Sequence, residues 1–184
     1  MEHRSTPAGV FGRAREIVRN GERLDMGALA ADTGVSRATL YRWTGDRERL
    51  LADASWAEVD GLLAHFDRVT PGRGLPHLER LARDFLDALA GNSALQALLA
   101  NEGDNGMRLL TSPNGGVRPR LVAAVAAVIE RAMEQGYAPP DDPSVLADGI
   151  VALGERWLYH AGDPAMNPDP ATARRMITLL LRES

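Results

Sequence analysis

One short stretch, Leu29–Trp43, constrains the fold of this chain more than any other, because it predicts two short helices joined by a tight turn. Gly34 supplies the positive φ angle that ends the first helix. Ser36 is placed to cap the second helix by accepting a hydrogen bond from a backbone N–H group. Val35 and Leu40 are the apolar residues that we expect to pack between the two helices.

The exposed face of the second helix carries cations, hydroxyl groups and a methyl group but no acid, which suits a helix laid in the major groove of DNA. Arg37 and Arg42 are predicted to contact bases or phosphates, since a bidentate arginine–guanine pair contributes about 1–3 kcal/mol of discrimination. Hydroxyl groups are predicted to position the helix on the phosphate backbone. The candidate DNA-binding residues in and beside this helix are Ser36, Arg37, Ala38, Thr39, Tyr41, Arg42 and Arg47. The alternative for the arginines is ordinary solvated surface charge.

The charge of the chain is unevenly distributed. Residues 1–51 hold nine Arg and seven Asp or Glu, whereas residues 52–184 hold twelve Arg and eighteen Asp or Glu. This asymmetry is consistent with a small nucleic-acid-binding head on an acidic body, although an ordinary acidic protein explains the body equally well. All 21 basic residues are arginine, so every cationic contact is a guanidinium fork suited to phosphate or guanine. The chain contains no cysteine, which excludes disulfides and thiolate metal sites.

Apolar residues recur at helical spacing in nearly every segment, and no β-branched alternation occurs, so the predicted fold class is all-α. We expect nine to ten helices, at about 8–20, 26–33, 36–43, 46–69, 76–90, 93–102, 118–136, 143–161 and 170–182, with one more short helix and a mobile loop within 103–117. Asp25 and Asp46 are the expected caps of the second and fourth helices. Residues 1–46 are expected to form a three-helix helix-turn-helix DNA-binding domain, and residues 47–184 a helical ligand-binding and dimerisation domain.

No segment of the sequence predicts a membrane span. The longest apolar run, Leu121–Ile129, is nine residues long, which is too short to cross a bilayer. The polar N-terminus is followed by no apolar signal segment. We therefore expect a cytoplasmic protein without a membrane partner.

Residues 25–51 resemble the DNA-binding motif of the TetR family of transcriptional regulators. The residues that carry the resemblance are Leu29–Ala31, Gly34–Ser36, Leu40-Tyr41 and the helix start Arg47–Leu51. The resemblance implies a homodimer in which each subunit has an N-terminal DNA head and a C-terminal helical body. The body would bind a small molecule and dimerise through its last two long helices, and most such proteins are repressors that a ligand releases from DNA.

Two positions depart from the pattern of this family. Thr44 stands where the family usually has an aromatic ring that locks the recognition helix against the next helix. We expect Trp43 to take over part of that packing, and because this position usually faces a phosphate, Trp43 is also a candidate DNA-binding residue. Asp25 stands where the family often has Thr, and a carboxylate caps a helix but repels phosphate, so lower DNA affinity is expected. Residues 42–47 resemble a sub-branch of the family associated with quorum-sensing lactone degradation.

Large apolar residues on separate helices of the predicted body are candidates for an effector pocket, since sites between helices are commonly lined in this way. The candidate ligand-binding residues are Phe66, Phe85, Leu89, Leu98, Met107 and Trp157. A place in the ordinary hydrophobic core explains each of them as well. Glu102, Asn105 and His160 are polar candidates, although a surface position is expected for each. The aromatic content of only 5% favours an aliphatic pocket, and hence an acyl chain or lactone over a planar polycyclic compound.

Apolar stripes at helical spacing along 143–161 and 170–182 are predicted to form a homodimer interface of four helices. The alternative is that they face only the core of their own chain. The four histidines form no i,i+4 pair or metal-ligand spacing, so we expect neither an enzyme nor a cofactor. One alternative function is an activator or ligandless regulator with the same DNA head. Another is a protein-interaction module whose weakened head no longer binds DNA, with Thr44 and Asp25 as the residues that indicate it.

Overall fold

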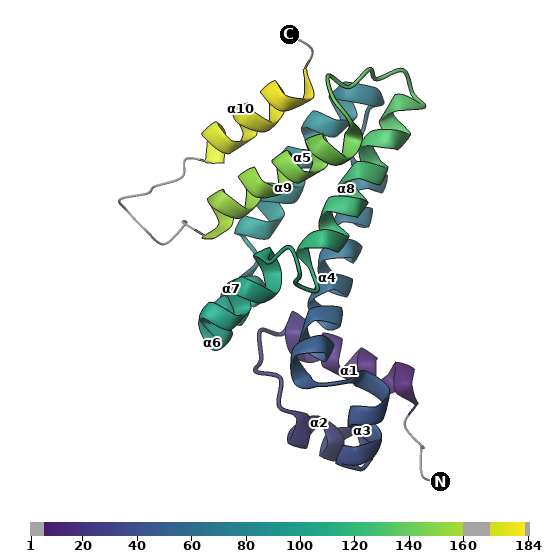
Figure 1. Ribbon diagram of the computed structural model, residues 1–184, viewed down its shortest axis with the longest axis vertical. Coiled ribbons are helices and arrows are strands. Elements are labelled where there is room, and N and C mark those ends of the chain that lie inside the picture. Colours follow the sequence, from purple (N-terminus) through teal and green to yellow (C-terminus); the bar gives the residue numbers. More distant parts are fainter. Residues whose placement is uncertain (1–5, 160–169, 183–184) are drawn as a thin grey trace. The chain divides into compact units, whose positions relative to one another are not determined.

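The computed structural model describes residues 6–159 and 170–182, and this part of the chain contains ten α-helices and no strand (Figure 1). The predicted all-α fold class is confirmed. None of the described helices combines the length and the apolar character that crossing a bilayer requires. The chain divides into two compact units, and helix α4 (Arg47–Val69) contributes residues to both.

The helix-turn-helix segment has the capping that its sequence predicts. Helix α2 (Met26–Thr33) begins at Asp25, whose carboxylate accepts hydrogen bonds from the N–H groups of Gly27 and Ala28. It ends at Gly34, whose φ of 66° lies in the left-handed region that glycine tolerates. Helix α3 (Arg37–Thr44) begins at Ser36, whose hydroxyl accepts a hydrogen bond of 3.1 Å from the Thr39 N–H group.

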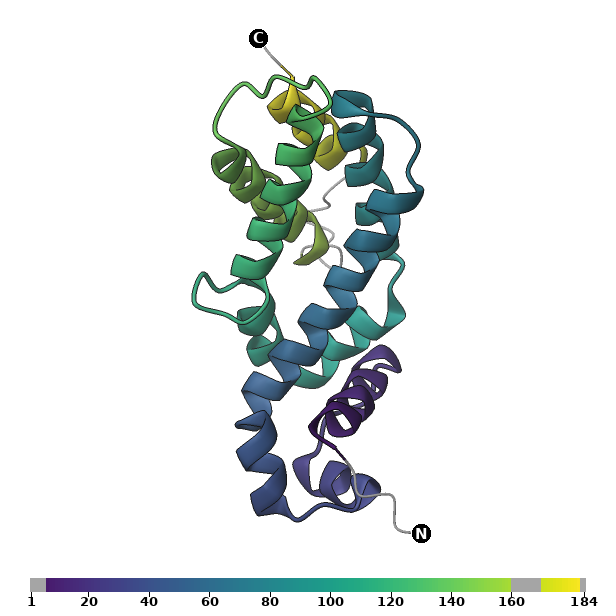
Figure 2. The same cartoon turned by 90° about the vertical axis from the view of Figure 1, so that its right-hand side faces the viewer.

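The first compact unit comprises the described residues up to Val59 together with Asn92–Val117. It contains α1 (Pro7–Arg19), α2, α3, the first part of α4, α6 (Ser93–Glu102) and α7 (Asp104–Thr111). Figure 2 shows α1 and the helix-turn-helix pair packed together, and Val10, Leu29, Leu40 and Leu50 are completely or almost completely buried. Helix α6 belongs to this unit because it packs on α1 and on the turn that follows it.

Two close approaches tie the inserted segment 92–117 to the N-terminal helices. A Cβ atom added at Gly21 would lie 2.7 Å from the side chain of Ala97 in α6. A Cβ atom added at Gly116 would lie 2.3 Å from the side chain of Ala52 in α4. No side chain fits at either contact without movement of the backbone, so both positions depend on glycine. Asn101 adds a hydrogen bond of 3.1 Å from its side-chain amide to the Gly21 carbonyl.

The second compact unit comprises Asp60–Gly91 and the described residues from Arg118 onward. It contains the end of α4, α5 (Gly74–Ala90), α8 (Arg118–Met133), α9 (Pro143–Tyr159) and α10 (Pro170–Leu181). Helix α9 packs on α8 and α10, and α5 packs on the same three helices (Figure 1). The amphipathic α5 buries the apolar face predicted from the sequence, namely Leu78, Leu81, Phe85, Leu86 and Leu89.

Where both ends are described, the observed helices agree with the predicted ones to within three residues, and α7 is the short helix predicted within 103–117. The predicted helix end at 161 lies outside the described residues. The end of α8 at Met133 differs most, because the predicted helix runs to Gly136, which has a φ of 93° and lies in a turn. The compact units do not follow the predicted domain boundary at 46/47, since α4, α6 and α7 supply residues to the first unit. A functional boundary at that point stays a prediction.

Tyr137 anchors the last turn of α10, because its buried hydroxyl donates a hydrogen bond of 2.6 Å to the Leu181 carbonyl. Replacing Tyr137 with Phe leaves that carbonyl without this donor, and we expect the free energy of unfolding to fall by about 1 kcal/mol. Urea unfolding followed by circular dichroism measures the change. The matched control is Tyr41→Phe at an exposed position, and equal stability of the two variants would contradict the assigned role.

Candidate functional site

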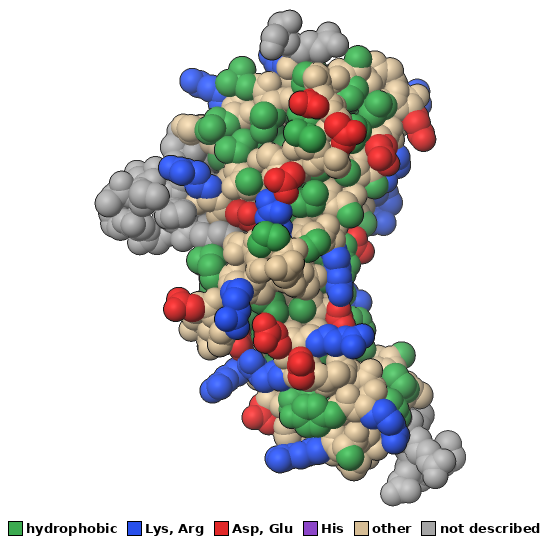
Figure 3. Space-filling model, in the orientation of Figure 1, with side chains coloured by type: hydrophobic (Ala, Val, Ile, Leu, Met, Phe, Trp, Pro, Cys, Tyr) green, Lys and Arg blue, Asp and Glu red, His purple; other side chains and the backbone are tan. Residues whose placement is uncertain are grey.

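The surface of α3 presents the residues that were predicted to contact DNA. Ser36, Arg37, Ala38, Tyr41 and Arg42 are exposed, whereas Thr39 and Trp43 are half-buried. Tyr41 is 48% exposed, which is unusual for an aromatic side chain that serves only packing. Arginine side chains also protrude from the part formed by α1–α3 on the face shown in Figure 3. The helix therefore offers guanidinium and hydroxyl groups to a partner outside the chain.

The Arg37 side chain lies across the start of α2, close to Asp25, one of the two residues that depart from the family pattern. A Cβ atom added at Gly27 would come within 2.7 Å of the Arg37 guanidinium group. Hydrogen bonds from the Ala28 and Gly27 N–H groups hold the pKa of Asp25 below its usual value, and the charge of Arg37 lowers it further. Because Asp25 is ionised beside this cation, part of the repulsion between its carboxylate and a phosphate is offset.

The turn from α3 to α4 requires glycine and does not depend on an aromatic ring at residue 44. Gly45 has a φ of 73° and a ψ of −153°, a backbone conformation open essentially only to glycine. The Thr44 hydroxyl donates to the Leu40 carbonyl at 3.0 Å, within its own helix. Asp46 then caps α4 by accepting a hydrogen bond of 2.8 Å from the Arg49 N–H group. Local hydrogen bonds of Thr44 and Asp46 thus define this turn, whereas the family pattern implies that an aromatic ring at residue 44 packs there.

Arg47 differs from its predicted role as a phosphate contact. Its Nε donates a hydrogen bond of 2.7 Å to the Leu24 carbonyl, and its two terminal nitrogens form a bidentate pair with the carboxylate of Glu102. The Glu102 side chain is only 7% exposed, so this candidate surface residue is buried instead. The pair raises the pKa of Arg47 and lowers that of Glu102, in both cases mainly through their hydrogen bonds. Arg47 is thus half-buried in the first unit, with its donors engaged by its own chain and 34% of its side chain exposed.

A second ionic contact holds α1 against α4 in the same unit. Glu58 accepts hydrogen bonds of 2.9 Å from Arg15 and of 3.0 Å from Arg19. Burial raises the pKa of Glu58, but the hydrogen bonds from Arg19 and Arg15 outweigh it and leave the pKa below its usual value. The orientation of α1 is therefore coupled to α4 by a carboxylate that stays charged at neutral pH.

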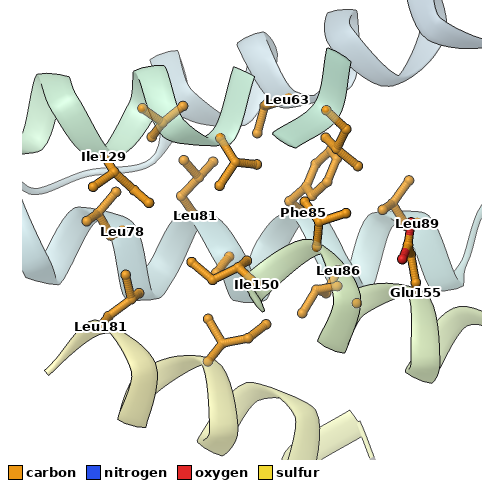
Figure 4. Close-up of a pocket in the computed structure, with 17 residues that line it drawn as sticks. Leu63, Leu78, Leu81, Phe85, Leu86, Leu89, Ile129, Ile150, Glu155 and Leu181 are labelled. Carbon is orange, nitrogen blue, oxygen red and sulfur yellow. The ribbon is translucent and has the colours of Figure 1, made fainter. Parts of the chain in front are cut away.

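The second unit encloses a cavity of about 100 Å³ between its helices (Figure 4). The cavity is lined almost entirely by aliphatic side chains from α4, α5, α8, α9 and α10, with Phe85 as the one aromatic ring among its described lining residues. The labelled lining residues in Figure 4 are Leu63, Leu78, Leu81, Phe85, Leu86, Leu89, Ile129, Ile150, Glu155 and Leu181. Such a surface favours hydrocarbon and offers little to a polar group.

Glu155 is the only ionisable residue among the described residues that line the cavity, and it pairs with Arg118. Arg118 lies 3.2 Å from the Glu155 carboxylate and also pairs with Asp148 at 2.8 Å. Burial raises the pKa of Glu155, although Arg118 opposes this shift. One cation is therefore shared between two carboxylates at this end of the cavity.

Comparison with known protein families decides the class of this chain. Residues 73–182, more than half of the sequence, match the family described as the tetracyclin repressor-like C-terminal domain. The chain belongs to the TetR family of transcriptional regulators. Because the TetR family is one of regulators, the protein is not an enzyme. No curated protein sequence matches the chain.

Solved structures of TetR proteins share the fold of the whole chain. The transcriptional repressor QsdR from R. erythropolis matches with a TM-score of 0.83 and 24% identity, over 97% of this chain and 96% of its own. A TetR-family regulator from Pectobacterium atrosepticum matches with a TM-score of 0.63 and 21% identity, over 96% and 92% of the two chains. The repressor AlkX from Dietzia sp., implicated in biodegradation of n-alkanes, matches with a TM-score of 0.63 and 18% identity, over 98% and 96%.

Among the predicted ligand residues of this TetR protein, two are found at the cavity. Phe85 and Leu89 line the cavity, but Phe66 is not among its lining residues and instead makes an edge-to-face contact with His65 at 5.3 Å. Leu98 and Met107 lie in α6 and α7 of the first unit. Trp157 is in the last turns of α9, and its side chain lies outside the described residues, as does His160. Asn105 accepts a hydrogen bond from Arg108 on the surface of α7.

Several lining residues were missed because size and aromatic character guided the choice. Leu81, Leu86, Ile129 and Ile150 are ordinary aliphatic residues that are indistinguishable in sequence from core positions. The apolar face of 76–90 was the available signal, since all five of its residues named above line the cavity. Glu155 carried no signal, because a glutamate near the end of a helix is usually exposed.

We expect Glu102→Gln to destabilise this TetR protein by about 1–2 kcal/mol at pH 7, because it leaves Arg47 without its charged partner. The pKa of Glu102 is lowered in the folded state, so its stabilisation is present above the unfolded pKa near 4.5 and is lost as the pH falls through the folded value. The difference in unfolding free energy between wild type and variant should therefore shrink below about pH 4.

Urea unfolding at pH 7 and at acidic pH measures this difference. Carboxylates such as Glu58 are common to both proteins, so their titration cancels in the comparison. Glu48→Gln, an exposed position at the start of α4, is the matched control. A difference between wild type and Glu102→Gln that stays constant with pH would contradict the assigned ion pair.

Proposed function

We propose that this protein is a dimeric, ligand-responsive transcriptional repressor that leaves its operator when a small apolar molecule binds the second unit. The observation that carries the proposal is the capped helix α3, whose exposed face holds Arg37, Ala38, Tyr41 and Arg42 with no acid among them. Membership of the TetR family supports a repressor fold. A protein that acts on the chromosome shares its compartment, so the proposed location is the cytoplasm.

In the proposed complex, each α3 enters the major groove of one half of a pseudo-palindromic operator. The two half-sites would lie about 34 Å apart, one turn of DNA, or a multiple of that distance. Arg37 and Arg42 would contact bases or phosphates, and Ala38 is small enough to approach a thymine methyl group. The hydroxyls of Ser36, Thr39 and Tyr41 and the indole N–H of Trp43 would position the helix on phosphates. Arg47 is left out, because its donors are engaged with Glu102 and Leu24.

We expect the double variant Arg37→Ala/Arg42→Ala to weaken binding to the DNA upstream of the protein's own gene by at least about tenfold. Wild-type affinity should fall steeply with salt, and each lost phosphate contact should reduce the slope of log K against log salt by about 0.9. Fluorescence anisotropy with labelled DNA at two salt concentrations measures both quantities. Arg68→Ala, at an exposed arginine of the second unit, is the control and should bind as wild type does.

If neither the wild type nor the double variant binds that DNA above the non-specific level, the next experiment is to select operators from genomic DNA fragments with the wild-type protein. Failure there as well would favour the alternative, a protein-interaction module whose DNA head is weakened. Asp25 and Thr44 motivate this alternative. The carboxylate of Asp25 repels phosphate, and Thr44 lacks the aromatic ring that usually locks the recognition helix in this family. The contact of Arg37 with the start of α2 argues against it.

A homodimer through α9 and α10 is supported by apolar side chains that their own chain leaves uncovered. Val145 on α9 is 56% exposed, and Met176 and Leu179 on α10 are 45% and 66% exposed. Large apolar residues gathered on neighbouring helices are typical of an interface between copies. We therefore propose that α9 and α10 of two subunits form a four-helix interface.

We expect Leu179→Glu to shift the protein from dimer to monomer, because a carboxylate in an apolar interface loses its hydration without gaining a partner. Size-exclusion chromatography with multi-angle light scattering gives the mass directly. Val69→Glu is a matched control, since Val69 is a similarly exposed apolar residue of α4 outside the proposed interface. Two monomeric variants, or two dimeric ones, would each be inconsistent with an interface centred on α10.

The aliphatic cavity supports an effector with an acyl chain, alone or on a lactone ring, over a planar polycyclic compound. Helix α4 supplies Leu63 to the cavity and begins immediately after the turn that ends α3. Binding in the cavity would release DNA only if the effector has different affinities for the DNA-bound and released conformations. We propose α4 as the element whose position differs between those two conformations.

A further inference from the structure

The cavity in the second unit is small and almost entirely apolar. Its volume of about 100 Å³ is below the roughly 150 Å³ of an apolar protein cavity that takes up benzene. Glu155 is its only ionisable lining residue, and that carboxylate is paired with Arg118. A short alkyl segment fits such a space, whereas a polar headgroup would have to lie elsewhere.

A second concave surface adjoins the cavity within the same unit. This groove of about 360 Å³ runs between α5 and α10, and three residues, Ala82, Leu86 and Ile177, line both it and the cavity. The side chains of these three residues therefore form part of the wall between the cavity and the groove, and a molecule seated in the groove can contact that wall.

The groove is rich in arginine. Its lining includes Arg83, Arg174, Arg175 and Arg182, against a single carboxylate, Glu79. Helix α5 supplies one of these arginines and α10 supplies two more, with Arg182 directly after α10. Guanidinium forks at this density match the geometry of a carboxylate.

Three of the four arginines that line the groove pair with carboxylates in or beside it. Arg83 pairs with Asp84, Arg174 with Asp87, and Arg182 with Glu79. Arg175 lines the groove and forms no ion pair with any residue that the structure describes, so its charge is left unpaired within that part of the chain. The Nε atom of Arg174 is buried and has no hydrogen-bond partner among those residues, which leaves a donor available.

We propose that the groove and the cavity together bind an anionic amphiphile, with its carboxylate on Arg174 and Arg175 and its alkyl chain passing Leu86 into the cavity. The inference deepens the proposed function, because it assigns the effector to the class of short- and medium-chain carboxylates. The other end of the cavity disfavours an anionic head, because Glu155 lies there and Arg118 is already shared by two carboxylates. An uncharged lactone would form no charge-assisted hydrogen bond with these arginines.

Isothermal titration calorimetry of the full-length protein with sodium octanoate tests the site, with 1-octanol as the uncharged probe of equal length. We expect octanoate to bind at least about tenfold more tightly than 1-octanol, since charge-assisted hydrogen bonds to guanidinium are lost in the alcohol. In the series butanoate, hexanoate and octanoate, affinity should rise about fourfold per added methylene until the cavity is full. Chain-length dependence distinguishes this site from a surface that holds any small anion.

The variant Arg175→Gln should weaken octanoate binding by about tenfold while leaving 1-octanol binding unchanged. Arg80→Gln, on α5 but outside the groove, is the matched control and should bind octanoate as wild type does. Circular dichroism verifies that each variant is folded. Equal affinity for octanoate and 1-octanol, absence of chain-length dependence, or no effect of Arg175→Gln would each overturn the proposal.

Anisotropy measurements of DNA binding, made without and then with octanoate, separate this inference from the proposed function. Specific DNA binding combined with failure to bind octanoate would leave the repressor in place and remove the amphiphile site. Octanoate binding that shows the expected chain-length and Arg175 dependence, in a protein that binds no DNA, would support the site and remove the repressor. Release of DNA at the octanoate concentration that saturates the site would support both.

Discussion

The pair between Arg47 and Glu102 is the interaction on which the organisation of the first unit depends. It joins three parts of the chain that are far apart in sequence, because the same guanidinium group also binds the Leu24 carbonyl. The Glu102 carboxylate is only 7% exposed, and leaving it without Arg47 would lower the stability of the folded state. The pair therefore holds α6 against the N-terminal helices. Since Arg47 opens α4, the pair also sets the position of that helix immediately after the turn that ends α3. The ion pair between Arg47 and Glu102 thus supports the candidate DNA-binding surface of α3 although neither residue belongs to that helix.

The two units divide polar and apolar interactions differently. In the first, ion pairs of Arg47 with Glu102 and of Glu58 with two arginines orient the helices around a small core. In the second, an aliphatic interior surrounds the cavity, and four arginines line the groove between α5 and α10. Helix α4 is the only described helix with residues in both units, so a change in cavity packing and a change at α3 have one continuous element in common.

Local features of the structure were predictable from sequence, and long-range pairings were not. Asp25, Gly34 and Ser36 determine their helix ends through contacts with residues at most a few positions away, which a pattern of residue types reveals. Arg47 and Glu102 are separated by 55 positions, and nothing in either residue's neighbourhood indicates the other. The cavity shows the same limit. Leu98 is as apolar as Leu89, but the first lies in α6 and the second in α5, and only the fold assigns them to different units.

The discontinuity of the first unit has a consequence for protein engineering. Residues 92–117 lie after α5 in the chain and yet pack against α1 and α4, with Gly21 against Ala97 and Gly116 against Ala52. A fragment that ends after α3 lacks Arg47 and Ala52 altogether and exposes Gly21, whereas one that ends within α4 after Ala52 exposes both contacts and leaves Arg47 without Glu102. A chimera that transfers this head to a different regulator therefore has to carry α6 and α7 with it, or else replace the surface that they cover. The transferable unit therefore consists of two segments of chain, and the second segment begins after α5, a helix of the other unit.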